Sequence, residues 1–392
     1  MLRIGLEIDC LIWPNRSGIP NHTVGVLRGF KSAGLSNYLT LFLNRKPATS
    51  IHPYYREAVS GYRIKRFENA YQFAYQIRMK FGPYARQDVF QTMTTIYQPI
   101  LQTRLNSFLI PDLTSILMPE HHLPENRDHW CRLFDTISNN SGLVITYSDH
   151  TRQEAITHLG LAPERVVAIP LGYGAEYCVL PSDRVAAALQ PLGLVPGKYI
   201  LNVGTLEPRK NHILLFRAYA KLKDRGLVNG VPLVLAGGRG WLYESVEEEL
   251  SRLGLREDVR FVGFVDCLSE LYNGAAMMVY PSRYEGFGLP PLEAMACGTP
   301  VIVSNTTSLP EVVGTAGVLV DPDDVDGLAE AIARVLTDSE YRLSLSTAGL
   351  NRASRFSWAS CAKNMYAAYE TAVARRKGNY DVIQTRSDLL VT

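Results

Sequence analysis

Six consecutive β→α units between residues 199 and 336 constrain the fold of this chain more than any other feature. In each unit a short apolar run of strand length is followed by a segment with helical spacing. The predicted strands are Tyr199–Val203, Leu233–Ala236, Val259–Val262, Met277–Tyr280, Val301–Val303 and Val318–Val320, and the predicted helices are Ile213–Lys223, Glu244–Leu253, Leu268–Asn273, Pro290–Ala296, Leu309–Val313 and Val325–Leu336. This alternation predicts a parallel sheet covered on both faces, in a doubly wound α/β domain.

The first 170 residues show a less regular form of the same alternation. Strands are predicted over Leu2–Ile8, Tyr38–Leu43, Ser107–Ile110, Leu143–Thr146 and Val166–Ile169, with helices from Asn21 or Thr23 to Ala33 and over Thr151–Leu159. Residues 54–104 are aromatic and basic, with helical spacing from Tyr71 to Arg78. A loop-like stretch, residues 172–197, is rich in Gly and Pro. We therefore expect domains of residues 1–172 and 173–357, then a final helix and tail over 358–392.

Charge is distributed unevenly along the 392 residues. Residues 1–110 hold 14 basic and 5 acidic side chains, which leaves 26 basic and 33 acidic ones for residues 111–392. A basic N-terminal part indicates a domain that faces an anionic partner. The six cysteines are far apart and show no metal-ligand spacing, which is typical of a reducing compartment. With no secretory signal and no apolar window near about 18 residues, we expect a cytoplasmic protein.

The segment Gly204-Thr205-Leu206-Glu207-Pro208-Arg209-Lys210-Asn211 follows a predicted strand and opens a predicted helix. Glycine lets the backbone approach a ligand, and a helix N-terminus presents unpaired N–H groups and a positive dipole. Arg209 and Lys210 oppose that dipole, so the pair is unfavourable there unless an anion lies between the two cations. We interpret the pair as a clamp for a diphosphate, with two solvated cations as the alternative.

A second segment, residues 284–293, also lies between a strand and a helix. Gly286 and Gly288 allow backbone amides to reach a ligand. Glu285 is expected in the loop and Glu293 in the first helical turn, and carboxylates accept hydrogen bonds from sugar hydroxyls. Taken singly, Glu285 is better explained as a surface turn residue and Glu293 as a favourable acid at a helix N-terminus. Their spacing and placement together favour a ligand site.

Two further glycine-containing loops follow strands. Ala236–Trp241 lets a ligand approach the backbone after the second strand of the C-terminal region. Ser17–His22, which contains Gly18, follows the first strand of the chain and is placed to meet a phosphate. An ordinary βα turn explains that loop equally well.

We expect no metal site. His121, His122 and His150 have no partner at the spacing of metal ligands. Asp321 and Asp323 are interpreted as turn formers, not as a pair at a strand end that holds a metal and a diphosphate.

The two glutamates eight residues apart around Gly-Phe-Gly-Leu resemble the E-x7-E signature of retaining GT-B glycosyltransferases of family 4. The resemblance is nearly continuous from about residue 199 to 336 and weak over 1–170. The other segments that carry it are Val203–Asn211, Val279–Ser282, Glu293–Ile302 and Ser308–Gly314. It implies two Rossmann-like domains facing a cleft, the N-terminal one binding acceptor and the C-terminal one a nucleotide-diphosphate sugar. It also implies that the final helix crosses back to the N-terminal domain.

Roles for individual residues follow from the resemblance. It implies that Arg209 and Lys210 neutralise the diphosphate and that Glu293 binds the ribose hydroxyls. Glu285 and the amides of four residues would hold the donor sugar and its phosphate: Gly286, Phe287, Gly288 and Leu289. Backbone at Gly263, Phe264 and Val265 would contact the base, while Gly18 and Gly204 would lie near the phosphates. The implied reaction retains configuration and needs no cofactor, metal or side-chain base, because the leaving phosphate oxygen accepts the proton.

The segment Glu207–Asn211 resembles mannosyl- and rhamnosyl-transferring members, which favours GDP-mannose as donor. The expected acceptor is a glycan or a lipid-linked molecule in polysaccharide assembly. A UDP- or dTDP-sugar-dependent transferase (glucosyl, N-acetylglucosaminyl or rhamnosyl) remains the alternative. So does a non-catalytic nucleotide-sugar-binding partner, because Pro111-Asp112 stands where the family has a His-Asp pair.

Six cations in the N-terminal region predict a peripheral contact with anionic lipid headgroups, with a solvated helical face as the alternative. They are Arg63, Lys65, Arg66, Arg78, Lys80 and Arg86. We expect no nucleic-acid partner.

Overall fold

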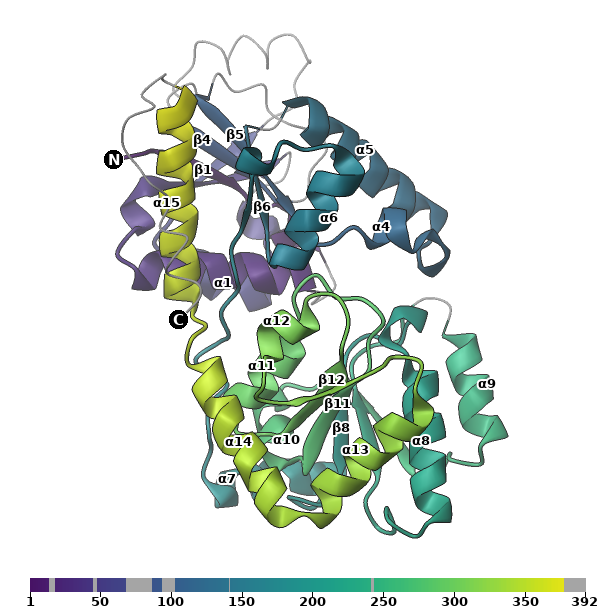
Figure 1. Ribbon diagram of the computed structural model, residues 1–392. Coiled ribbons are helices and arrows are strands. Elements are labelled where there is room, and N and C mark those ends of the chain that lie inside the picture. Colours follow the sequence, from purple (N-terminus) through teal and green to yellow (C-terminus); the bar gives the residue numbers. More distant parts are fainter. Residues whose placement is uncertain are drawn as a thin grey trace. The chain divides into compact units, whose positions relative to one another are not determined.

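The computed structural model describes residues 1–13, 18–44, 48–67, 87–93, 103–140, 142–240 and 243–376 (Figure 1). Contacts divide the chain into two compact units. The first unit comprises Met1–Pro111, Asp128–Gly172 and the described part of Ser357–Thr392, and the second comprises Asp112–Arg127 and Tyr173–Phe356. This division differs from the expected boundaries at Asp112–Arg127, which contacts group with the second unit.

The first unit contains a parallel sheet of strand order β3-β2-β1-β4-β5-β6-β7. The strands are β1 (Ile4–Glu7), β2 (Leu39–Asn44), β3 (Arg63–Phe67), β4 (Val89–Thr92), β5 (Leu105–Ile110), β6 (Leu143–Thr146) and β7 (Val166–Ala168). The helices are α1 (Gly18–Ser32), α2 (Arg56–Val59), α5 (Pro124–Asn140), α6 (Asp149–Leu159) and α15 (Trp358–Arg376). The five predicted strands are confirmed, whereas β3, β4 and α5 were not predicted.

Two of the cations predicted to contact lipid, Arg63 and Lys65, lie on β3. This strand forms an edge of the described sheet, so the alternative of a solvated helical face is wrong for these two residues. Alternating charge is a common feature of edge strands because it discourages pairing with another chain. The predicted helical spacing from Tyr71 to Arg78 lies outside the described residues. So do Lys80, Arg86 and the side chain of Arg66. Membrane contact stays a prediction.

Helix α15 packs against α1, far from it in sequence (Figure 1). Trp358, its first residue, fits a slot in which α1 carries glycines. A Cβ atom at Gly25 would lie 2.2 Å from the indole ring, and one at Gly29 would lie 2.1 Å from the Trp358 carbonyl oxygen. The Tyr369 hydroxyl donates a hydrogen bond of 2.9 Å to Gln91 Oε1 on β4. The C-terminal helix therefore completes the first unit.

The second unit contains a parallel sheet of strand order β10-β9-β8-β11-β12-β13. The strands are β8 (Ile200–Val203), β9 (Leu233–Ala236), β10 (Val259–Gly263), β11 (Met277–Tyr280), β12 (Val301–Ser304) and β13 (Val318–Val320). The helices are α4 (Thr114–Leu117), α7 (Ser182–Leu189), α8 (His212–Asp224), α9 (Glu244–Arg252), α10 (Leu268–Gly274), α11 (Leu289–Ala296), α12 (Leu309–Val313), α13 (Val325–Thr337) and α14 (Ser339–Ala353). All six predicted strands are confirmed, and α14 was not predicted.

The strand order of the second unit decides which loops meet. Numbered within the unit it is 3-2-1-4-5-6, the order of doubly wound nucleotide-binding domains, in which ligands bind where the order reverses. That reversal lies between β8 and β11, and β12 flanks β11 on its other side. The loops that follow these three strands therefore leave neighbouring strands at the carboxyl edge of the sheet.

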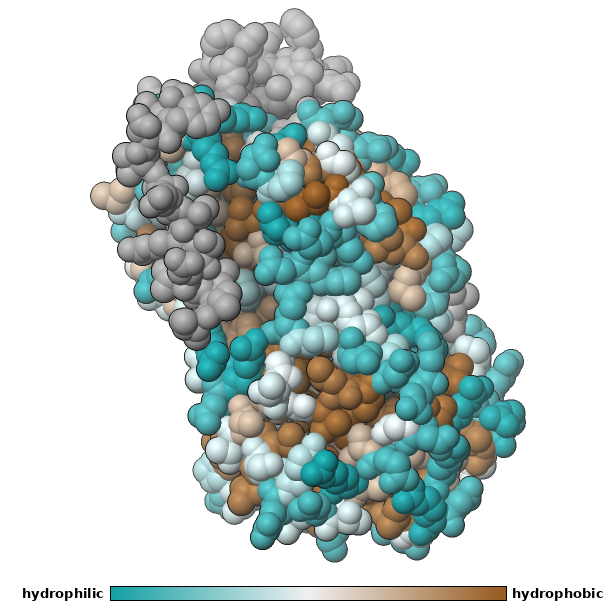
Figure 2. Space-filling model, viewed as in Figure 1, coloured by the Kyte–Doolittle hydropathy of each residue, from teal (hydrophilic) through white to brown (hydrophobic). Residues whose placement is uncertain are grey.

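On the face shown in Figure 2, hydrophilic residues are interspersed with smaller apolar areas. Exposed apolar side chains of the second unit include Val179, Val195, Phe264 and Leu343. Single exposed apolar residues are common on folded proteins. Within the described ranges, no helix combines the length and the apolar composition that a bilayer crossing requires.

Candidate active site

The loop after β8 turns two cations inward. Arg209 and Lys210 lie in a 3₁₀ turn, Pro208–Lys210, and Asn211 then adopts φ 58° before α8 begins at His212. We had expected the two cations to lie at the start of the helix. Instead, both precede it. Their side chains are only 17% and 10% exposed, so the alternative of two solvated cations is wrong.

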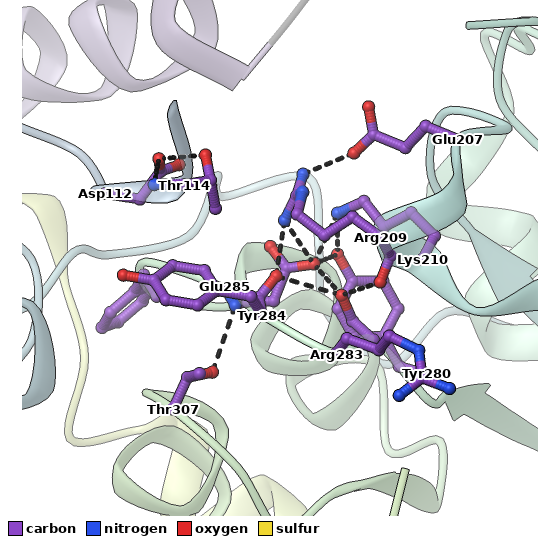
Figure 3. Close-up of polar contacts among 12 residues, drawn as sticks. Asp112, Thr114, Glu207, Arg209, Lys210, Tyr280, Arg283, Tyr284, Glu285 and Thr307 are labelled. Carbon is purple, nitrogen blue, oxygen red and sulfur yellow. Dashed lines mark hydrogen bonds and ion pairs between the residues drawn. The ribbon is translucent and has the colours of Figure 1, made fainter. Parts of the chain in front are cut away.

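The anion between the two cations is Glu285, from the loop after β11 (Figure 3). Its Oε1 atom lies 2.6 Å from Lys210 Nζ and 3.1 Å from Arg209 Nη1. The same oxygen accepts hydrogen bonds from Ser282 Oγ (2.7 Å) and the Tyr280 hydroxyl (2.9 Å). Glu285 is buried, so it is no surface turn residue. The predicted anion at the cation pair is supplied, in this structure, by the protein itself.

A second buried carboxylate, Glu207, completes the charge balance. Its Oε1 atom accepts a hydrogen bond of 2.6 Å from Arg209 Nη2, while Arg209 Nη1 donates to the Tyr284 carbonyl oxygen at 2.6 Å. Two cations and two carboxylates therefore share one buried site. Buried charges of this kind are stable only when each is paired and hydrogen-bonded.

The pKa values follow from burial and from these pairs. Burial alone would raise the pKa of Glu285, but Arg209 and Lys210 outweigh it and lower the value to about 2. Burial and the neighbouring Arg209 lower the pKa of Lys210. Glu285 and Glu207 raise the pKa of Arg209 despite its burial. Glu285 is therefore ionised at neutral pH and compensates the cations.

Glu293 lies in a different environment. Helix α11 starts at Leu289, one residue before the predicted start, so Glu293 falls in the second turn and not in the first. Its Oε2 atom accepts a hydrogen bond of 3.0 Å from the Tyr272 hydroxyl of α10. Burial raises the pKa of Glu293 to about 8, and the nearby Glu176 acts in the same direction.

The predicted glycine loop at 286–289 is buried from Gly286 to Gly288. Gly288 precedes α11 with φ 110°, and a Cβ atom there would lie 2.8 Å from Leu309 Cδ2. A larger residue would thus be both strained and crowded. Phe287 is buried and packs edge-on against Phe356, with ring centroids 6.0 Å apart.

Glu207, Arg209, Lys210 and Glu285 form a charged cluster, and of the other predicted residues Gly204 borders it, since a Cβ atom there would lie 3.5 Å from Lys210 Cε. Gly204 follows β8, and its carbonyl oxygen would lie 2.1 Å from a Cβ atom at Gly237, which explains the glycine after β9. Gly263 ends the edge strand β10, and the exposed Phe264 ring packs on Gly238. Val265 follows in the same loop.

Gly18 is exposed at the start of α1 in the first unit. Asp112 accepts hydrogen bonds from the backbone N–H (3.0 Å) and hydroxyl (2.6 Å) of Thr114, the first residue of α4. In the described ranges, no group of three or more His, Cys, Asp or Glu side chains is arranged to hold a metal ion.

Three members of the cluster were not singled out from the sequence: Glu207, Tyr280 and Ser282. All three lie in segments that carried the family resemblance, but a lone Glu, Tyr or Ser has no spacing that marks it. Their place in the site becomes clear only from the pairing of β8 with β11 in the sheet. That adjacency places both loops at one edge.

The family model "Glycosyl transferases group 1" matches residues 190–352. O-antigen chain mannosyltransferase B of Escherichia coli is 38% identical over 262 residues, which cover 66% of this chain and 68% of that protein. The chain belongs to the group 1 glycosyltransferases.

One further relative and one solved structure are also similar to this chain. Serotype-specific mannosyltransferase WbdA of Escherichia coli is 34% identical over 265 residues, 64% of this chain and 31% of that protein. The crystal structure of Anabaena Alr3699/HepE in complex with UDP and glucose covers 95% of this chain and 100% of its own, with a TM-score of 0.75 and 18% identity. With two parallel sheets of seven and six strands, this glycosyltransferase has the GT-B fold of two Rossmann-like domains.

Proposed function

We propose that this glycosyltransferase moves a mannosyl group from GDP-mannose to a glycan or lipid-linked acceptor in polysaccharide assembly, with retention of configuration. The observation that carries the proposal is the buried pair Arg209 and Lys210 at the strand-order reversal. The two relatives described above are named mannosyltransferases, one of them for the O-antigen chain. We further propose that the first unit binds the acceptor and the second the donor.

The proposed chemistry brings the donor diphosphate to Arg209 and Lys210 in the positions in which Glu285 holds them. In this structure Glu285 Oε1 occupies the position between Arg209 and Lys210. Diphosphate oxygens are good acceptors for the same guanidinium and ammonium donors. As the sugar–phosphate bond breaks, negative charge develops on the leaving phosphate oxygen, and fixed cations stabilise it. The acceptor hydroxyl attacks the anomeric carbon and gives its proton to that leaving oxygen.

Because two side-chain cations supply this charge stabilisation, we propose that transfer needs no divalent metal. Activity should persist after EDTA treatment and dialysis. Loss of activity in EDTA with recovery on adding Mg²⁺ or Mn²⁺ would contradict this part of the proposal.

A thermal-shift screen of GDP, UDP, ADP and dTDP tests the donor. GDP should stabilise the protein most, since a ligand that binds only the folded state raises its melting temperature. A larger shift with UDP or dTDP would replace mannose with another sugar. Turnover of GDP-mannose, with the product's anomeric configuration read by NMR, then tests the reaction. Binding of GDP without turnover of any sugar donor would instead support a non-catalytic nucleotide-sugar-binding protein.

A further inference from the structure

The loop that carries Glu285 is held from both sides. On the β8 side, the Arg283 backbone N–H donates to the Arg209 carbonyl oxygen at 2.9 Å. On the β12 side lie three consecutive residues with hydroxyl groups, Thr306, Thr307 and Ser308, here named the hydroxyl triad. Because β11 lies between β8 and β12, both flanking loops reach the loop of Glu285.

Each member of the hydroxyl triad bonds the backbone of residues 283–287. Thr306 Oγ1 donates to the Arg283 carbonyl oxygen at 3.0 Å. The Glu285 N–H donates to Thr307 Oγ1 at 3.1 Å (Figure 3). Ser308 Oγ lies 2.7 Å from the Glu285 carbonyl oxygen and 2.8 Å from that of Phe287. Both backbone groups of Glu285 are thus fixed by side chains of one short segment.

Thr307 adopts a backbone conformation that its residue type disfavours. Its φ is 56°, in the left-handed region that β-branched residues rarely occupy. Within the described ranges, the non-glycine residues with positive φ are Thr307 and Asn211, and both belong to loops around the charged cluster. Such conformations persist where surrounding structure imposes them, and they concentrate at functional sites.

Ser308 is placed where serine usually has another task. It is the N-cap residue of α12, where a serine hydroxyl commonly accepts a hydrogen bond from the helix backbone. Here the side chain makes no capping bond, and the buried hydroxyl bonds the loop of Glu285 instead. Thr307 therefore has a disfavoured φ and Ser308 lacks a capping bond, while both residues bond the backbone of residues 283–287.

We propose that the hydroxyl triad positions Glu285 for catalysis. Thr306, Thr307 and Ser308 are positioning residues that act through the backbone of Glu285 and hold its carboxylate against Arg209 and Lys210. This role rests on the proposed function of those three charged residues in donor turnover. Misplacement of a reacting geometry by about 1 Å can lower a rate roughly 10²-fold, so small shifts of this loop matter.

The test uses the full chain with GDP-mannose as donor probe and three variants. Thr307→Val removes the acceptor of the Glu285 N–H and keeps the shape. Thr307→Ser keeps the hydroxyl group, and Ser308→Ala removes the bonds to two carbonyls. We expect kcat for GDP release to fall about tenfold in Thr307→Val and about 10²-fold in Ser308→Ala. Thr307→Ser should restore most activity, and GDP affinity should change less than about twofold in all three, because neither Arg209 nor Lys210 is altered.

Amide hydrogen exchange of the peptide that spans residues 283–287 gives a readout independent of turnover. Exchange should accelerate in Thr307→Val and Ser308→Ala and stay unchanged in the matched control Thr337→Val. The Thr337 hydroxyl bonds the Ala333 carbonyl oxygen within α13, away from the cluster. Unchanged exchange in both test variants would overturn the proposal, and so would faster exchange with unchanged kcat. If wild-type protein releases no nucleotide from any sugar donor, the proposed function fails, while the exchange result still decides whether the triad fixes this loop.

Discussion

Glu285 and Glu293 belong to one sequence motif, yet they lie in opposite electrostatic environments. Glu285 sits between two cations that lower its pKa to about 2. Glu293, eight residues on, is bonded by a tyrosine hydroxyl, and burial raises its pKa to about 8. A sequence motif therefore fixes which residues are present but not whether they are ionised. The ionisation of each glutamate depends on the charged and polar groups in the loops that the sheet places next to it.

Among the predicted effects, the largest should follow from substituting Lys210, one of the two cations beside Glu285. Lys210→Ala removes one charge from the pair while leaving Glu285 and Glu207 in place. We expect turnover of GDP-mannose to fall by about 10²–10³-fold, as when a donor that stabilises transition-state charge is lost. The control is Lys221→Ala on α8, whose ion-pair partner Asp326 is exposed. Near-normal turnover in Lys210→Ala would refute the clamp.

Removal of the negative charge at Glu285 should destabilise the fold. Glu285→Gln leaves Arg209 and Lys210 with one buried carboxylate between them, and breaking a buried pair is costly. We expect the free energy of unfolding at pH 7 to fall by about 3 kcal/mol. Because the folded pKa is below the unfolded one, this contribution is present above pH 4.5 and is lost toward pH 2. Urea unfolding at pH 7 and pH 3 should show the deficit shrink, and an equal deficit at both would contradict the pairing.

Glu293 should act on nucleotide binding more than on turnover. Glu293→Ala removes a carboxyl group that we propose contacts the ribose hydroxyls. We expect the Kd for GDP to rise about tenfold, with a smaller change in kcat. Isothermal titration calorimetry measures the affinity. An unchanged Kd would show that Glu293 serves only the packing of α11 against Tyr272.

Glu293→Gln should change the free energy of unfolding in the opposite direction from Glu285→Gln. The folded pKa of Glu293 lies above the unfolded value, so ionisation opposes folding increasingly as pH rises from 4.5 to 8. Glu293→Gln should therefore raise the free energy of unfolding by about 1 kcal/mol at pH 8.5 and by nothing measurable at pH 4. Glu248→Gln on the exposed surface of α9 is the control. Stabilisation that is equal at both pH values would exclude titration of Glu293 as its cause.

The sequence predicts the second unit better than the first for a physical reason. Five of the six strands of the second sheet carry no charged side chain, the edge strand β10 carries only Arg260, and each of the six was found. In the first unit β3 reads Arg-Ile-Lys-Arg-Phe, and charge interrupts any apolar run because the strand lies at an edge. Helix α14 was missed because its sequence is rich in Ser and other polar residues, which leaves a weak apolar stripe.

The charged cluster was predicted only in part. Arg209, Lys210 and Glu285 are of types that bind anions and hydroxyl groups, so each drew attention in its loop. Glu207 and Ser308 carry no such signal, since their roles depend on which loops are neighbours at the sheet edge. Strand order is a property of the whole domain, and no local window of sequence contains it.

The docking of α15 on the first unit has a consequence for the order of folding. Chains are made from the N-terminus, and domains commonly fold as they emerge. Here Trp358, which fills the slot at Gly25 and Gly29, is synthesised only after all of Tyr173–Phe356. The unit that begins first on the ribosome must therefore wait with an open groove, and the unit made later is complete before it.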